Sequence, residues 1–370
     1  MMCDPLILAV PGVRGLVPYE PGKPIEELER ELGVTNAIKL ASNENAYGPS
    51  PKALAAMSQA LTQVARYPDG GAFALKRALA EQLGVGLGQI TLGNGSNDVL
   101  ELIARTFLSP GEVAVCDQYA FAAYPISVRG IGAQMVMVPA REYAHDLVAM
   151  AAALNATVRM VFLANPNNPT GTWFTVDELE QFLDACPKST IVVLDEAYFE
   201  YVTETDYPDG RTLLARHANL IVVRTFSKVH GLAGLRIGYA LSVAPLAELM
   251  NRLRQPFNVN GVGQAAAVAA LGDRAYVEQM VAVNQAERKR LRSAICDLGL
   301  TVLPSVGNFL CIKVGDALRV YQALLRKGVI VRPLVPYGMA HHLRVTVGRP
   351  EENARFVREL GLLTGFAREA

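Results

Sequence analysis

The sequence predicts an α/β protein, with a large domain built on a mostly parallel sheet and a smaller α+β domain. Three observations support this prediction. The chain has 370 residues, which exceeds the usual size of a single hydrophobic core. Short apolar runs alternate with amphipathic helical patterns through its middle, as in parallel sheets covered by helices on both faces. The C-terminal third changes to charged helical segments around isolated strand-like runs.

The predicted strands of the large domain are seven short runs rich in branched aliphatic residues. Amphipathic segments such as 99–107 and 176–185 lie between them, and the second opens with Thr-Val-Asp-Glu, which is typical of a helix N-terminus. The strand-like runs are 90–92, 113–116, 135–138, 158–163, 190–194, 220–223 and 236–240.

The small domain is predicted to combine both ends of the chain. A long charged helix at 276–298 precedes a C-terminal α+β pattern, and the Pro- and Gly-rich first 40 residues are expected to join it or to cross to a partner subunit. We therefore expect a large domain over 50–271 and a small domain made of 1–49 and 272–370. The further elements expected there are strands at 309–314 and 343–347 and helices at 317–327 and 351–362.

Composition excludes several classes of partner. Lys+Arg 35 balance Asp+Glu 35, so no net charge attracts nucleic acid or an anionic membrane. The N-terminal apolar stretch is too short for a signal peptide, and the Ala/Val-rich run 262–271 is too short to cross a bilayer. A soluble, cytoplasmic protein is therefore expected. Its thiols are expected to be reduced and to form no metal site, because the cysteines are scattered, odd in number and not paired at metal-ligand spacing. They are Cys3, Cys116, Cys186, Cys296 and Cys311.

Three polar residues follow predicted strands at their carboxyl ends. Asp195 comes directly after Ile-Val-Val-Leu, and Asn168 lies in Asn-Pro-Asn-Asn-Pro-Thr-Gly after Val-Phe-Leu-Ala. Lys228 follows Leu-Ile-Val-Val-Arg-Thr-Phe-Ser. Because open parallel sheets bind ligands beyond the carboxyl ends of their strands, we expect these side chains to converge on one crevice.

The residue types fit the contacts of a pyridoxal phosphate ring. Lys228, among hydroxyls and glycines, is placed to form a Schiff base with an aldehyde. Asp195 could keep a ring nitrogen protonated, although a helix cap or a structural ion pair would also explain it. Tyr198 could reach the ring hydroxyl or be a buried tyrosine with one hydrogen bond, and the Asn168 loop could be an ordinary turn.

A phosphate site is predicted where a strand, a glycine turn and a helix beginning near Val99 follow one another. Backbone N–H groups at a helix N-terminus favour an anion. A dinucleotide site is disfavoured, since the third glycine of Gly-x-Gly-x-x-Gly is missing and no clear ribose acid follows. Arg236 lies in an apolar setting where a charge needs a partner. The predicted phosphate ligands are Gly95, Ser96, Asn97, Ser227 and Arg236.

Several other residues are open to two interpretations. Phe121 could stack on the ring or be a core aromatic, and Tyr67 and Asn43 lie in loops that could reach the site. The histidines His230, His341 and His342 could act in acid–base chemistry, but surface or packing roles are the expectation.

Together these motifs resemble the fold-type-I, aspartate-aminotransferase-like superfamily of pyridoxal phosphate enzymes, and within it the histidinol-phosphate aminotransferases. The resemblance covers nearly the whole chain in order and spacing. Its motifs are Leu-Ala-Ser-Asn-Glu-Asn at 40–45, Arg-Tyr-Pro-Asp, Gly-Asn-Gly-Ser-Asn-Asp, Asn-Pro-Asn-Asn-Pro-Thr-Gly, Asp-Glu-Ala-Tyr, the lysine segment and Leu-Arg-Val-Thr-Val-Gly ending at 348.

The resemblance implies a role for each matching residue. Lys228 would be the Schiff-base lysine, Asp195 the partner of the pyridine nitrogen and Tyr198, with Asn168, a ligand of the ring oxygen. Arg344 would bind the anionic group of the substrate, assisted by Arg332, with Asn43 also at the substrate. The implied cofactor contacts are Gly95, Ser96, Asn97, Phe121, Asn168, Asp195, Tyr198, Thr225, Ser227, Lys228, Arg236 and, from the partner subunit of a homodimer, Tyr67.

The implied reaction is transamination from histidinol phosphate to 2-oxoglutarate, in histidine biosynthesis. Two positions depart from the family pattern. Ala46-Tyr47 replaces the usual Pro-x on the loop that lines the substrate pocket, and His230 stands where tyrosine or phenylalanine is common. An aromatic-amino-acid aminotransferase of broad specificity and a threonine-phosphate decarboxylase therefore stay open as alternatives.

Overall fold

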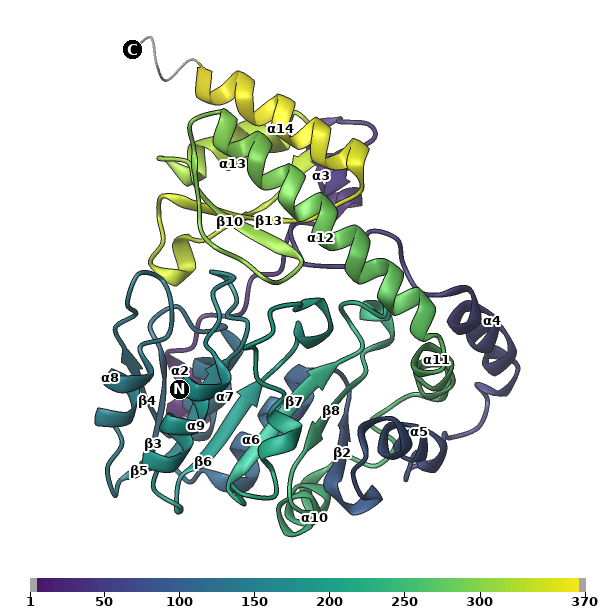
Figure 1. Cartoon of the computed structure of the whole chain (residues 1–370), viewed down its shortest axis with the longest axis vertical. Coiled ribbons are helices and arrows are strands. Elements are labelled where there is room, and N and C mark those ends of the chain that lie inside the picture. The colour runs from purple at the N-terminus through teal and green to yellow at the C-terminus, as the bar shows by residue number, and fades with distance from the viewer. Residues whose placement is uncertain (1–4, 366–370) are drawn as a thin grey trace.

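The structure is a computed structural model that describes residues 5–365 of the chain, so Cys3 and the outermost ends of the predicted small domain lie outside the described residues. Figure 1 shows a large unit around a twisted sheet and a smaller unit above it. The long helix α12 (Arg274–Asp297) runs from one unit to the other.

The large unit contains a seven-stranded sheet in the order β2-β8-β7-β6-β5-β3-β4. Strand β8 runs antiparallel to both of its neighbours, and the other neighbouring pairs are parallel. The prediction of a mostly parallel central sheet is confirmed. The strands are β2 (Ile90–Gly93), β3 (Val113–Asp117), β4 (Gln134–Val138), β5 (Val158–Ala164), β6 (Ile191–Asp195), β7 (Leu220–Thr225) and β8 (Gly238–Leu241).

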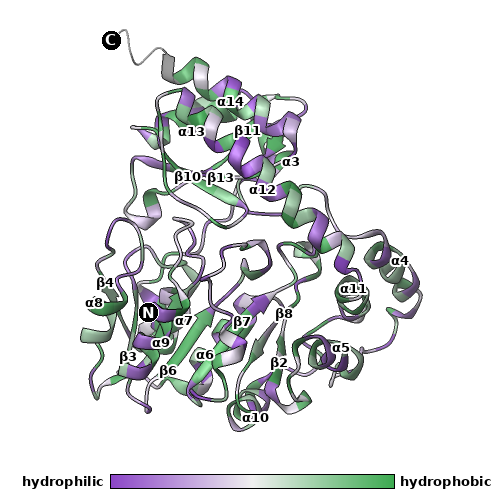
Figure 2. Cartoon of the chain, viewed as in Figure 1, coloured by the Kyte–Doolittle hydropathy of each residue, from purple (hydrophilic) through white to green (hydrophobic). Residues whose placement is uncertain are grey.

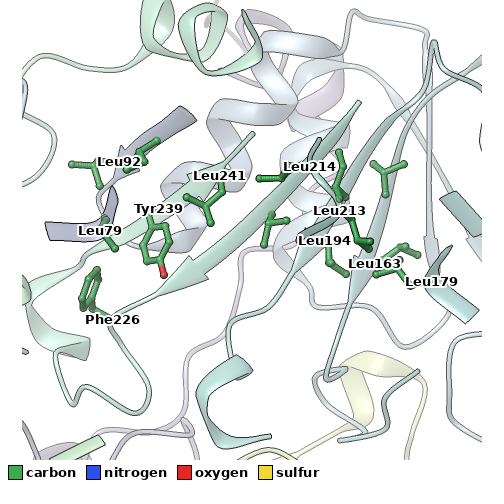
Figure 3. Close-up of a cluster of buried hydrophobic side chains, with 14 of the residues drawn as sticks. Leu79, Leu92, Leu163, Leu179, Leu194, Leu213, Leu214, Phe226, Tyr239 and Leu241 are labelled. Atoms are coloured by element: carbon green, nitrogen blue, oxygen red, sulfur yellow. The ribbon is translucent and has the colours of Figure 1, made fainter. Parts of the chain in front are cut away.

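Helices cover both faces of this sheet. Successive side chains of a strand point to opposite faces, so neighbouring residues belong to different cores. Leu194 belongs to one core and Val193 to the other. Figure 3 shows the first core, where Leu163 and Leu241 lie near Leu194. Its helices are α4 (Pro51–Ala60), α5 (Phe73–Leu83), α8 (Leu147–Ala152), α9 (Val176–Ala185) and α11 (Gly261–Leu271), and those of the second core are α6 (Ser96–Phe107), α7 (Ala123–Ile131) and α10 (Ala244–Leu253).

Two predicted boundaries next to the phosphate motif were wrong by a few residues. Helix α6 begins at Ser96, not near Val99, because Gly95 adopts a φ of 86° and turns the chain directly into the helix. Strand β8 begins at Gly238, since Arg236 has a φ of 55° and closes a short 3-10 turn before the strand. As a result, Ser96 at the start of α6 and Arg236 before β8 both lie at the carboxyl edge of the sheet.

The smaller unit is an antiparallel sheet in the order β12-β13-β10-β9, covered by helices. Figure 2 shows α12 with both hydrophilic and hydrophobic residues along its length, as a helix half exposed to solvent requires. The elements are β9 (Thr301–Val302), β10 (Phe309–Lys313), β12 (Arg332–Pro333), β13 (His342–Thr346), α13 (Ala317–Arg326) and α14 (Pro350–Gly365).

The N-terminal segment lies along both units. Strand β1 (Ile38–Lys39) pairs in parallel with β11 (Val329–Ile330) of the smaller unit, next to α3 (Ile25–Leu32). Upstream, α2 (Pro11–Arg14) follows α1 (Pro5–Leu8) and packs against α7 of the large unit. This segment therefore passes the junction of the two units. The predicted domain boundaries at 49/50 and 271/272 stay a prediction.

Three findings bear on the expected class of protein. The four cysteines that the structure describes are all free. Within residues 5–365, no group of three or more acidic, histidine or cysteine side chains is arranged to hold a metal ion. No helix in that range combines the length and the apolar character needed to span a membrane.

Candidate active site

A cavity of about 360 Å³ lies beyond the carboxyl ends of β5, β6 and β7. Each strand supplies a polar residue: Asn168 from the loop after β5, Asp195 from the end of β6 and Lys228 from the loop after β7. The structure brings most of the predicted site residues to this cavity. Those that line it are Asn43, Ser96, Asn97, Phe121, Asn168, Asp195, Tyr198, Thr225, Ser227, Lys228, Arg236 and Arg344.

Lys228 is the buried amine of the cavity. Its Nζ donates a hydrogen bond of 3.2 Å to the carbonyl oxygen of Ser42 and lies 5.4 Å from the ring centroid of Tyr198. Burial and, to a smaller extent, the charge of Arg344 lower the pKa of the Lys228 amine to about 7, against the opposing effect of Glu44. A large share of this amine is therefore neutral, and nucleophilic, at neutral pH.

Asp195 is held by two hydrogen bonds that orient its carboxylate. Oδ2 accepts from the Tyr124 hydroxyl at 2.7 Å, and Oδ1 accepts from the backbone N–H of Ala197 at 3.1 Å. Burial raises the pKa of Asp195, while these two bonds and the charge of Lys228 lower it. Sequence reasoning did not single out Tyr124. Its signal is a tyrosine one helical turn after Phe121 in an apolar helix, where a buried hydroxyl needs a partner.

Asn168 and Tyr198 each receive a hydrogen bond from a neighbour outside their own loop. Arg344 donates from Nη1 to Oδ1 of Asn168 and from Nη2 to the carbonyl of Ala41 at 2.6 Å. Asn43 donates from Nδ2 to the Tyr198 hydroxyl at 2.9 Å. Burial raises the pKa of Tyr198 to about 12, so this hydroxyl keeps its proton at neutral pH.

The part of the cavity next to helix α6 is lined by residues that are typical of an anion site. Ser96 and Asn97 open helix α6, whose N-terminus favours negative charge. The Thr225 hydroxyl donates to Ser227 Oγ at 3.0 Å, and Arg236 Nη1 donates to the same oxygen at 3.3 Å.

Gly95 does not line the cavity, but it lies against the side chain of Arg236, which does. A Cβ atom at this position would lie 2.3 Å from Nη2 of Arg236, so only glycine allows the guanidinium to approach this closely. The φ of 86° at Gly95 requires glycine for a second reason, since side-chain residues rarely adopt it.

Phe121 lies on the wall of the cavity, edge-on to Tyr124 with ring centroids 5.8 Å apart. Tyr19, on the N-terminal segment, lies 6.2 Å from the Phe121 ring. Sequence reasoning did not predict Tyr19 or Glu44 as lining residues. No local signal marks them, because the long-range folding of the N-terminal segment brings them to the cavity.

Besides Gly95, two predicted site residues do not line the cavity. Tyr67 is 82% exposed and stacks on Phe257, with ring centroids 4.6 Å apart. Arg332 is buried beside the cavity, with its guanidinium carbon 5.4 Å from the ring centroid of Tyr19. The histidines do not line the cavity either: His230 and His342 are buried in packing, and His341 is exposed.

A family model described as aminotransferase class I and II matches residues 35–360, which is most of the chain. The chain belongs to this aminotransferase family. It is 56% identical to histidinol-phosphate aminotransferase 2 of Pseudomonas fluorescens over 96% of this chain and 97% of the relative. It is 55% identical to histidinol-phosphate aminotransferase 1 of Nitrosococcus oceani over 95% and 96% of the two chains. The predicted family and the predicted class of enzyme, a transaminase, are confirmed.

Solved structures agree with this assignment. The crystal structure of histidinol-phosphate aminotransferase from Sinorhizobium meliloti in complex with pyridoxal-5'-phosphate superposes with a TM-score of 0.89, at 32% identity over 96% of this chain and 97% of that one. An aspartate aminotransferase from Thermus thermophilus shares the fold with a TM-score of 0.81, at 22% identity over 94% of this chain and 98% of that one. The predicted fold type is confirmed.

The cavity of this aminotransferase fits pyridoxal phosphate on its own chemistry. It offers an amine for the aldehyde at Lys228 and a buried carboxylate for the ring nitrogen at Asp195. Donor groups for the ring oxygen and an anion site for the phosphate lie on either side. The aldehyde, the ring nitrogen, the ring oxygen and the phosphate of the cofactor each have a matching residue.

The lowered pKa of Lys228 gives a prediction for the cofactor-free protein. Only the neutral amine reacts with acetic anhydride, so acetylation of Lys228 should reach half of its maximal rate near pH 7. Exposed lysines on the same protein provide the comparison, since an ordinary lysine amine has a pKa of about 10.4. Competitive labelling followed by peptide mass spectrometry measures both. If the acetylation rate of Lys228 depended on pH in the same way as that of the exposed lysines, burial would not lower the pKa of its amine.

Proposed function

We propose that this aminotransferase transfers the amino group of histidinol phosphate to 2-oxoglutarate, in histidine biosynthesis, with pyridoxal phosphate as its cofactor. The observation that carries the proposal is that two guanidinium groups line the same cavity as a lysine whose pKa is lowered to about 7. Arg236 lies at one end of the cavity and Arg344 at another, with Lys228 lining the same space. The relatives named histidinol-phosphate aminotransferase, at up to 56% identity over nearly the full chain, support the choice of substrate.

The cofactor is held by residues from several strand ends. Ser96, Asn97, Thr225, Ser227 and Arg236 hold its phosphate, with Gly95 beneath them. Phe121 would pack on its ring, and Asn168 and Tyr198 would donate to its ring oxygen. When bound, pyridoxal phosphate supplies an aldehyde that accepts the amino group and a ring that withdraws electrons from the bond that breaks.

Three residues of the chain carry out the proton chemistry. Lys228 would hold the aldehyde of the cofactor, and its neutral amine, once free, would move the proton of the donor's α-carbon to the carbon that had carried the aldehyde oxygen. Asp195 would keep a proton on the ring nitrogen, because its buried carboxylate is stabilised by a positive partner. The bond from Tyr124 keeps this carboxylate in place.

The donor's phosphate binds at Arg344. Its guanidinium uses Nη1 and Nη2 for Asn168 and Ala41, while Nε has no hydrogen-bond partner in the described structure and is buried. A buried guanidinium N–H without a partner costs free energy, which an anionic ligand would recover. Arg332, beside Tyr19, adds positive charge next to this position. Asn43 is the further substrate contact that the sequence predicts.

A half-reaction tests the substrate directly. The yellow, cofactor-loaded protein is mixed in turn with histidinol phosphate, phenylalanine and threonine phosphate, and the conversion to the pyridoxamine form is followed by absorbance. Histidinol phosphate should convert the protein faster than phenylalanine, because its phosphate matches the guanidinium of Arg344. Faster conversion by phenylalanine would instead indicate an aromatic aminotransferase. Release of carbon dioxide from threonine phosphate would indicate a decarboxylase.

We also propose that the active unit is a homodimer in the cytoplasm, in which Tyr67 reaches the cofactor phosphate of the partner subunit. Tyr67 is the most exposed of the large hydrophobic side chains that the structure describes, and it stacks on Phe257, itself 43% exposed. Exposed aromatic pairs of this kind are typical of subunit interfaces. The free state of the four described cysteines supports a reducing compartment.

Mixed subunits test this arrangement. Lys228→Ala and Tyr67→Ala chains should each have little activity alone, and a mixture refolded together should recover activity. In a mixed dimer one site combines the intact Lys228 of one chain with the intact Tyr67 of the other. Random pairing predicts recovery of about a quarter of the normal activity. If Tyr67 acted within its own chain, every mixed site would carry one substitution and no activity would return.

A further inference from the structure

Asn43 has its side-chain amide fixed in one orientation. The backbone N–H of Asn43 donates to Oγ1 of Thr346 at 2.9 Å, so this hydroxyl oxygen acts as an acceptor. The hydroxyl has one proton of its own, which it donates to Oδ1 of Asn43 at 3.3 Å. The amide oxygen of Asn43 therefore faces Thr346, and its NH₂ group faces Tyr198.

This orientation determines what the Tyr198 hydroxyl can do. Nδ2 of Asn43 donates to the Tyr198 oxygen at 2.9 Å, and an amide NH₂ cannot accept the hydroxyl proton in return. Tyr198 is almost fully buried, and a buried hydroxyl requires an acceptor. Since Tyr198 lines the cavity, its proton is directed into the space where the ring of the cofactor is proposed to lie.

We propose that Asn43 is a positioning residue that turns the hydroxyl proton of Tyr198 toward the ring oxygen of the cofactor. This inference rests on the proposed function, because the ring oxygen belongs to the proposed cofactor. It gives Asn43 a role different from the substrate contact that the sequence suggests. Asn43 acts through Tyr198, while Asn168 supplies its own NH₂ group beside it.

The smaller unit holds Asn43 in place. Asn308, at the start of β10, donates from Nδ2 to the carbonyl oxygens of Asn43 at 3.0 Å and of Glu44 at 3.4 Å. The preceding residue, Gly307, accepts from the side chains of Asn284 at 3.3 Å and Arg288 at 3.0 Å, both on α12. A chain of hydrogen bonds thus connects the long helix to the Tyr198 hydroxyl.

The backbone at Asn43 restricts which residues can occupy the position. Its φ is 55°, a left-handed conformation that asparagine, aspartate and glycine adopt more easily than other residues. Asn43→Gly therefore keeps the backbone and removes the amide. Asn43→Asp keeps the backbone and the shape, but it replaces the NH₂ donor by a carboxylate oxygen that accepts the Tyr198 proton and draws it away from the cavity.

The pH titration of the visible absorbance of the loaded protein is the test. A hydrogen bond donated to the ring oxygen stabilises its anionic state, so its loss should raise the pH midpoint. We expect an upward shift of about half to one pH unit in Asn43→Gly, the scale of one hydrogen bond. Asn43→Asp should shift the midpoint at least as far, because the proton of Tyr198 is then turned away.

Three further variants separate positioning from a general structural effect. Asn284→Ala removes one of the two side chains that bond Gly307 and leaves the bond from Arg288 in place, so it should keep the normal midpoint. In a Tyr198→Phe background, Asn43→Gly should produce little further shift, because the hydroxyl through which it acts is gone. Thr346→Val, which leaves the amide free to rotate, should raise the midpoint even if Asn43→Gly fails to fold.

The outcomes distinguish this inference from the proposed function. A normal protein that shows no pH-dependent visible absorbance after supply of pyridoxal phosphate would overturn the proposed cofactor, and with it this inference. A normal protein that titrates as expected, with Asn43 and Thr346 variants at the same midpoint, would overturn the role of Asn43 alone. A shift of equal size in the presence and absence of the Tyr198 hydroxyl would also overturn it.

Discussion

The burial of the Lys228 amine is the constraint on which the rest of the site depends. An ammonium group loses hydration when it is enclosed, and this loss, more than any neighbouring charge, moves the pKa of Lys228 to about 7. The cavity walls that enclose it come from distant parts of the chain. The backbone of Ser42, on the N-terminal segment, accepts the hydrogen bond of the amine, and Tyr198, after β6, places its ring beside it.

The charges around the amine follow from this constraint. Arg236 and Arg344 disfavour its protonated form, while Asp195 and Glu44 favour it. Each of these charges has a partner that keeps it in place: Ser227 for Arg236, Tyr124 for Asp195, Asn168 for Arg344 and Lys39 for Glu44. These bonds hold each charged group in a fixed position. They support the proposal that one guanidinium binds the phosphate of the cofactor and the other the anionic group of the donor.

Much of the site could be predicted from the sequence because parallel strands end at the same edge of a sheet. Asp195, Asn168 and Lys228 follow apolar strands, and hydrophobic periodicity locates those strands to within a few residues. The residues that sequence reasoning missed are placed by long-range packing. Tyr124 lies on helix α7, and Tyr19 lies on the N-terminal segment that crosses both units. No local sequence pattern therefore indicates their contacts.

The shifted starts of α6 and β8 have local physical causes. The positive φ angles of Gly95 and Arg236 shift the start of α6 and β8, and periodicity does not detect single left-handed residues. Tyr67 lies far out on the surface of the single chain, where its predicted role needs a second subunit. Asn43 was expected at the substrate, and only the orientation of its amide shows that it is bonded to Tyr198.

The central claim is that Lys228 is the amine that binds the aldehyde of the cofactor. Its most direct test is to load the protein with pyridoxal phosphate, reduce it with sodium borohydride and locate the attached pyridoxyl group by peptide mass spectrometry. The account predicts a single modified peptide that carries the group on Lys228, with no label after reduction of a Lys228→Ala chain. A stable label on another lysine, or none on the normal chain, would contradict it.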